Sequence, residues 1–282
     1  MSIDRLPLFC DPTLAERIER AEAQLVTASS EAARARRADA AGFVIPVSGG
    51  VASFTDEDSP FNKVAGLGFA GVPQTTVLDE VERAFAACGA PVQVELANLA
   101  DPAIGVLLTE RGYRLVSFEN VLGRSLTGQP ERVTPPGIQV RRIADGELDA
   151  WLDVVVEAFM HPDTEGLPQH EEFPREAIER AERDFVAAQG VACYFALVDG
   201  VIAGGASMRM AEGVAQFGAA TLPAYRRRGV QTALLSARVA DAAAAGCDIA
   251  VVTTQPGSKS QQNVQRRGFD LLYTRAILVK QP

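Results

Sequence analysis

Residues 221–235 read TLPAYRRRGVQTALL, and this stretch decides how the second half of the chain folds. It begins as the end of an apolar strand, continues as a basic loop and becomes a helix with an apolar face. The first N–H groups of a helix have no partner within the helix, and its dipole favours an anion beside them. Gly229 has no Cβ, so a ligand can approach its backbone closely. With charge from Arg226, Arg227 and Arg228, the stretch predicts a cradle for a pyrophosphate.

The sequence on either side of this cradle predicts an α/β unit with a mixed sheet and helices on both faces. The turn signal Asp199-Gly200 joins two apolar runs, and Gly246 stands where the long helix should end. The expected elements are a strand at 138–141, helices at 148–159 and 175–189, strands at 193–198, 201–210 and 214–221, a helix at about 228–245, a strand at 249–254, a short helix at about 258–267 and two closing strands at 271–273 and 274–280.

A linker is predicted at residues 127–137, which contain three prolines and two glycines. Proline fixes φ and lacks an N–H group, so it continues neither a helix nor a strand ladder. The linker divides the chain into a first domain at residues 1–126 and a second at 138–282.

The first half resembles the second in a degraded form. Arg111-Gly112-Tyr113 and the apolar residues after it match Arg267-Gly268-Phe269 and its followers in register. A glycine expected to end a helix lies 23 positions before Gly112 and 22 before Gly268, and an apolar strand falls within each interval. The spacing indicates a tandem duplication.

The basic loop resembles the acyl-CoA motif of the GNAT acetyltransferases, Gln/Arg-x-x-Gly-x-Gly/Ala. Arg226 and Gly229 fill the first and fourth positions, while Gln231 departs from the usual Gly or Ala. The order of elements over 138–280 is similar to the family's fold as well. The resemblance implies two GNAT-like mixed β-sheet domains with flanking helices, of which the first is degenerate.

The resemblance also implies a function: transfer of an acetyl group from acetyl-CoA (CoA as the carrier) to a primary amine of a small molecule or peptide. In this family the strand before the cradle bonds the pantetheine arm, and the strand at 249–254 diverges from the strand at 214–221. The candidate cofactor-binding residues are Ala219, Ala220, Thr221, Arg226, Arg227, Arg228, Gly229, Val230, Gln231, Thr232, Ser258, Ser260 and Asn263.

The catalytic groups are less evident. Many members of the family use a tyrosine four positions before the glycine that ends the last helix, and Val264 stands there. Tyr273 is the nearest alternative to that tyrosine as the acid. The competing interpretation is that Tyr273 is an aromatic residue of the core. The polar segment 161–172, with His161, Asp163, Glu165, His170, Glu171 and Glu172, should shape the acceptor site. Proximity with a water relay can also support transfer without a dedicated residue.

Two other functions stay open: a silent acyl-CoA-binding regulatory module and a purely structural tandem domain. The intact cradle disfavours the second of these. The first half has no arginine at the equivalent residues 69–76, FAGVPQTT, and Pro73 removes an N–H donor, so we expect it to pack against the active half, cover the acceptor cleft or form a homodimer.

Composition excludes several classes of protein. The 282 residues carry a net charge of −9, which disfavours nucleic-acid binding. The cysteines form no C-x-x-C pair and only two histidines are present, so no zinc site is expected. No P-loop motif occurs. Neither a signal peptide nor a membrane span is predicted, which makes the cytoplasm the expected location.

Overall fold

The computed structural model describes residues 6–37, 42–128, 130, 132–162 and 172–282. Their helices and strands, in chain order, are α1 (Pro12–Arg36), β1 (Phe43–Val47), β2 (Gly50–Phe54), β3 (Lys63–Ala65), α2 (Thr75–Ala87), β4 (Val92–Ala97), α3 (Pro102–Glu110), β5 (Arg114–Ser125), β6 (Ile138–Arg142), α4 (Leu148–Phe159), α5 (Arg175–Ala187), β7 (Val191–Val198), β8 (Val201–Ala211), β9 (Val214–Thr221), the 3₁₀ turn η1 (Pro223–Tyr225), α6 (Val230–Ala244), β10 (Ile249–Thr254), α7 (Lys259–Gln265) and β11 (Asp270–Lys280).

The strands form one mixed sheet of eleven, in the order β1-β2-β3-β4-β11-β5-β10-β9-β8-β7-β6. The α/β class is therefore confirmed, but the two halves share a continuous sheet and do not form one sheet each. Beyond residue 138 the expected elements are present, with one difference. The two expected closing strands are a single strand, β11, whose pairing with β5 shifts register between Leu271 and Tyr273.

The sheet is continuous because the last strand of each half inserts into the other half. Strand β11 lies between β4 and β5 of the first half, and β5 lies between β11 and β10 of the second. Glu119 and Arg275 each stand seven residues after the glycine of the Arg-Gly-aromatic motif, and the register pairs them directly. The two exchanged strands are therefore related by a local two-fold axis, and this axis passes through the Glu119–Arg275 pair.

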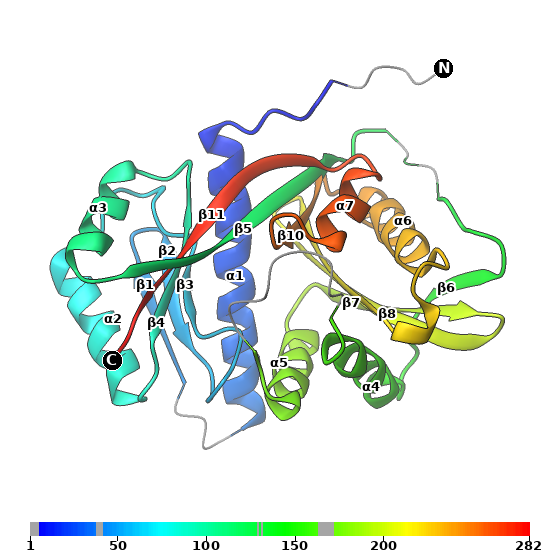
Figure 1. Cartoon of the computed structure of the whole chain (residues 1–282), viewed down its shortest axis with the longest axis horizontal. Helices are drawn as coiled ribbons and strands as arrows, with labels where there is room; N and C mark the ends of the chain where they lie inside the picture. The colour runs from blue at the N-terminus through cyan, green and yellow to red at the C-terminus, as the bar shows by residue number, and fades with distance from the viewer. Residues whose placement is uncertain (1–5, 38–41, 129, 131, 163–171) are drawn as a thin grey trace.

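The helices form two layers, one on each face of the sheet (Figure 1). Helices α2 and α3 pack on one face of the first half, and α6 and α7 pack on the same face of the second. Helix α1 crosses the opposite face behind β5 and β11, and it contacts α5 as well as strands of both halves. Helix α1 is not among the elements that the sequence pattern predicts. Among the described residues, no helix is both long and apolar enough to cross a membrane.

A row of charged side chains lies between α1 and the central strands. Side chains alternate between the two faces of a strand, and on the α1 face neighbouring strands present Lys63, Glu95, Arg275 and Glu119 in turn. The Arg275 guanidinium is buried and lies within 3.3 Å of carboxylates on β4, on β5 and at Glu19 of α1. One cation therefore joins both halves of the sheet to the helix that covers them.

We expect Arg275→Met to destabilise the protein by about 3–5 kcal/mol, because removing the cation leaves several buried carboxylates with too few partners. Urea unfolding followed by circular dichroism measures the change. Arg17→Met is the control: it removes the more exposed ion pair with Asp248 (2.7 Å) and should cost at most about 1 kcal/mol. Equal losses for the two variants would contradict this account of the fold.

Candidate active site

A slot opens between β9 and β10, the parallel pair in the second half. Their ladder pairs Ile249 with Val214 and continues only as far as Val251 with Gln216. Beyond this point the two strands no longer pair, as the family resemblance predicts. The ends of β9 and β10 therefore face each other across a gap in which backbone polar groups of each strand lack a partner on the other.

The cradle lies just beyond the end of β9. The chain passes through η1 and enters α6 at Gly229, whose φ of +88° is in the left-handed region that glycine adopts most easily. Arg227 also has a positive φ, +62°. Glycine has no side chain with which to cap α6, so the N–H groups of the first turn remain as donors facing the loop.

The three arginines of the loop lie around this helix end. Arg226 donates a hydrogen bond to the carbonyl of His161, which ties the loop to the end of α4. Arg228 stacks over the Tyr225 ring at 5.5 Å and lies 3.5 Å from Asp199. Arg227 and Arg228 are exposed. Positive charge is therefore concentrated where the helix dipole already favours an anion.

Two buried hydroxyls at the slot have no hydrogen-bond partner among the described residues: Thr221 Oγ1 at the end of β9 and Thr254 Oγ1 at the end of β10. By strand alternation both face the α6 and α7 side, since Ala215 and Val252 belong to the core beneath α6. Buried polar groups in proteins are normally paired. These hydroxyls fit a polar ligand that passes through the slot from the α6 side.

The other candidate cofactor residues fall into three groups. Ala219 faces the core beneath α6, whereas Ala220 is buried against α4 on the opposite face. Val230 is buried in the α6 core. Gln231 and Thr232 are half-buried in the first turn of α6, and the Thr232 hydroxyl accepts a hydrogen bond from Arg267 at 3.0 Å.

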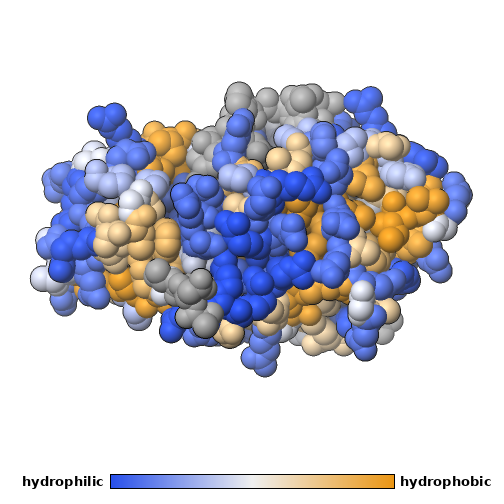
Figure 2. All heavy atoms as spheres, turned by 90° about the horizontal axis from the view of Figure 1, so that it is seen from below, coloured by the Kyte–Doolittle hydropathy of each residue, from blue (hydrophilic) through white to orange (hydrophobic). Residues whose placement is uncertain are grey.

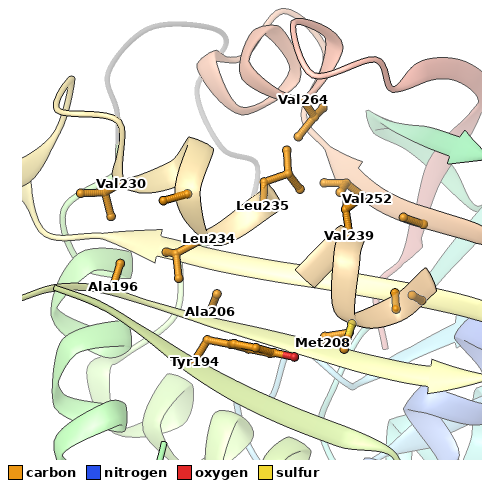
Figure 3. Packing of buried hydrophobic residues seen from close by; sticks show 14 of the residues in the cluster. Tyr194, Ala196, Ala206, Met208, Val230, Leu234, Leu235, Val239, Val252 and Val264 are labelled. Carbon is orange, nitrogen blue, oxygen red and sulfur yellow. The ribbon is translucent and has the colours of Figure 1, made fainter. Parts of the chain in front are cut away.

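On the α7 side, Ser258 caps the helix by accepting a hydrogen bond from the Gln261 N–H at 3.2 Å. Ser260 is exposed and Asn263 is half-buried. Val264, at the position of the family's tyrosine, is 1% exposed and points toward Leu235 of α6 in Figure 3. That position therefore belongs to the packing of α7 on α6.

Tyr273 lies on the α1 face of β11 and is only 3% exposed. Its hydroxyl donates a 2.6 Å hydrogen bond to Glu19, and burial raises its pKa well above the ordinary value. The core of this face surrounds the ring. These contacts favour a structural part for Tyr273.

The acceptor segment is described only at its ends. His161 is exposed, with Nδ1 2.9 Å from the carbonyl of Glu157, and Glu172 is exposed. Asp163, Glu165, His170 and Glu171 lie outside the described residues. No cluster of three or more metal-binding side chains occurs in the part of the chain that the structure describes.

Sequence reasoning missed a carboxylate beside the slot. On the α1 face, Gly218 of β9 and Thr253 of β10 are exposed although both strands are central in the sheet. Glu119 lies on that face of β5, diagonally next to Thr253, whose direct partner is Val121. The 29% exposed side chain of Glu119 contrasts with the buried carboxylate of Glu95. Strands β9 and β10 contain no carboxylate themselves, and the strand exchange brings Glu119 beside them. Glu22 of α1 also reaches this face, where it accepts a 2.9 Å hydrogen bond from Gln216 of β9.

The environment of Glu119 perturbs its protonation. Burial, reinforced by the Glu95 carboxylate, raises the pKa of Glu119 to about 7 against the opposing effect of Arg275 and Lys63. A carboxylate that titrates near neutral pH can both accept and release a proton there.

The equivalent place in the first half is packed. The loop after β3 contains Leu67, which is fully buried, and a Cβ at Gly68 would lie 2.4 Å from the Cβ of Ala100. Helix α1 approaches Gly66, where a Cβ would lie 2.9 Å from the Glu19 carbonyl. The described loop thus has neither the arginines nor the space of the second half.

Comparisons with known proteins concern a segment of the second half and the fold of nearly the whole chain. Residues 152–269 match the sequence model of a family described as the acetyltransferase (GNAT) family. Among solved structures, a GCN5-related N-acetyltransferase from Kribbella flavida is similar with a TM-score of 0.67 at 20% identity, covering 95% of this chain and 96% of that one. A tandem GNAT protein from the clavulanic acid biosynthesis pathway is similar with a TM-score of 0.59 at 14% identity, covering 89% and 87%. No curated protein matches the chain in sequence.

For Tyr273→Phe we expect turnover within about three-fold of the wild type, because its hydroxyl is committed to Glu19 and lies away from the slot. Stability should fall by about 1–3 kcal/mol, because the variant takes a hydrogen-bond donor from a buried carboxyl group. Steady-state kinetics and urea unfolding measure the two effects. A loss of turnover of a hundred-fold or more in a stably folded variant would return Tyr273 to the catalytic groups.

Proposed function

We propose, from the premise that the C-terminal half of this chain belongs to the GNAT acetyltransferase family, that the protein transfers an acetyl group from acetyl-CoA to a primary amine of a small molecule or peptide. The transfer is direct, with the amine attacking the thioester. One cofactor binds per chain, in the second of two related halves.

The observation that carries this proposal is the slot between β9 and β10 together with the uncapped end of α6. An extended ligand with an anionic group at one end and a thioester at the other fits both features. The N–H groups at residues 227–232, with Arg226 and Arg228, would hold the pyrophosphate. The unpartnered hydroxyls of Thr221 and Thr254 supply polar contacts for the amide-containing arm. When bound, acetyl-CoA supplies the activated acyl group.

Beyond holding the cofactor, the slot would favour transfer by positioning the thioester for attack by the amine. Packing of the thioester between two strands excludes water from its α6 side and leaves it open toward the α1 face, where Gly218 and Thr253 are exposed. An acceptor approaching from that face would reach the acyl carbon without entering the cofactor's path.

The proposal is tested by release of free thiol from acetyl-CoA in the presence of agmatine, spermidine, kanamycin, lysine and a short peptide with a free amino terminus. We expect release above the chemical background with at least one amine, and acetylated product by mass spectrometry. Binding of acetyl-CoA without turnover on any of these amines would favour the silent acyl-CoA-binding module, the alternative that Val264 supports.

We expect Gly229→Glu to abolish acetyl-CoA binding in calorimetry, because it places a carboxylate against the pyrophosphate and a Cβ 3.1 Å from Pro135. The left-handed backbone adds a strain of about 1–2 kcal/mol. Gly246→Glu is the matched control: its φ is +85°, it lies beyond the other end of α6, and nothing is within 4 Å of its Cβ position. Unchanged affinity in Gly229→Glu, or equal loss in both variants, would contradict the cradle.

A further inference from the structure

We infer that Glu119, on the strand that the first half donates to the second, is the group that accepts the proton of the acceptor amine. The active site is then composite: the second half holds the cofactor and the first half supplies the base. This inference rests on the proposed function and goes beyond it by assigning a catalytic residue and an acceptor charge.

Glu119 lies on β5 beside the open end of the slot. Strand β5 pairs with β10 from Ser125 to Asn120, and Thr254 at the end of β10 lies opposite Asn120. The next residue, Glu119, therefore lies just past the end of β10, where the slot is open. Asn120 faces α7, through a 3.3 Å contact with Gln261, so Glu119 faces the α1 side. This is the side on which Gly218 and Thr253 are exposed.

The carboxylate of Glu119 is anchored by Arg275. Glu119 Oε2 lies 3.1 Å from the Arg275 guanidinium, which also contacts Glu19 and Glu95. Arg275 is therefore already shared among carboxylates and does not neutralise Glu119 alone. The side chain is held at one oxygen yet remains 29% exposed, the arrangement that a group needs if it is to exchange a proton with a ligand.

The charges of the cluster around Glu119 come from five elements besides its own strand: α1 contributes Glu19 and Glu22, β3 Lys63, β4 Glu95, β8 Arg209 and β11 Arg275. Four carboxylates, counting Glu119, thus share three cations. On the molecular face seen from below, hydrophilic residues occupy the middle and hydrophobic residues lie toward both ends (Figure 2). The excess of carboxylates over cations in this cluster favours an acceptor that arrives as an ammonium ion.

The ammonium ion gives one proton to the Glu119 carboxylate, and the freed nitrogen lone pair attacks the thioester carbonyl carbon. The C–N bond forms and the C–S bond breaks. The nitrogen loses its second proton, the departing thiolate takes up one proton, and Glu119 returns its proton to water. The products are the N-acetyl amide, CoA thiol and one proton.

A pH dependence follows from the sign of the pKa shift. Only ionised Glu119 accepts a proton, and burial raises its pKa to about 7. The value of kcat/KM should therefore be low below pH 6, rise through about pH 7 and level off above it.

The test uses the full-length protein with whichever of the five named amines gives the highest thiol release. We expect Glu119→Gln to keep the acetyl-CoA affinity, lower kcat by about a hundred-fold and lose the rise near pH 7. Glu119→Asp keeps the charge on a shorter side chain, so it should recover part of the rate and retain a rise in the profile. Glu110→Gln, an exposed carboxylate at the end of α3, is the control and should leave rate and profile unchanged.

Thermal unfolding shows whether each variant is folded before its kinetics are compared. Unchanged kcat and an unchanged pH profile in folded Glu119→Gln would overturn the assignment and leave the proposed function standing. Absence of turnover by the wild type on every amine would overturn the proposed function and this inference with it. If Glu119→Gln loses stability, the profile of folded Glu119→Asp decides: a rise near pH 7 supports the assignment, and its absence contradicts it.

Discussion

The pairing of β5 with β11 is the interaction on which the rest of the structure depends. Each strand closes one half's sheet and lies next to the other half's strands, so neither sheet is complete without its partner. At the centre of this pair stand Glu119 and Arg275, which occupy equivalent positions in the two repeats. Two identical residues there would bring like charges together across a two-fold axis. An acid opposite a base removes that repulsion, an arrangement open to a duplicated chain whose halves have diverged.

The same pair links stability to the site. Helix α1 buries Arg275 among carboxylates and leaves Glu119 half-exposed at the edge of the cluster, beside the end of β10. A buried cation shared among several acids is costly unless its geometry is satisfied, so the cluster fixes the register of the central strands and the place of α1 together. The first half thus places a carboxylate beside the slot, while its described residues form no arginine-bearing loop like that of the second half.

The sequence predicted the second half closely because its elements carry local signals: apolar alternation, the Asp199-Gly200 turn and Gly246 after the long helix. The cradle was predictable for the same reason, since helix end, glycine and arginines are consecutive. The strand exchange was not predictable. The sequences of β5 and β11 are those of ordinary strands whether each pairs within its own half or within the other half, and tertiary contacts decide between the two pairings. Glu119 is not predictable for the same reason, because no local signal in the sequence places a strand of the first half beside the slot of the second. The long α1, whose buried face includes Glu19 and Glu22 beside alanines, gives a weak apolar pattern.

We propose one acyl-transfer site assembled from both halves, and a crystal structure of the full chain with acetyl-CoA is the decisive test of it. The claim predicts the pyrophosphate at the start of α6, the arm between β9 and β10, and the thioester open toward the face that carries Glu119. A cofactor bound in the first half, or a thioester directed away from Glu119 with β5 remote from it, would contradict the claim.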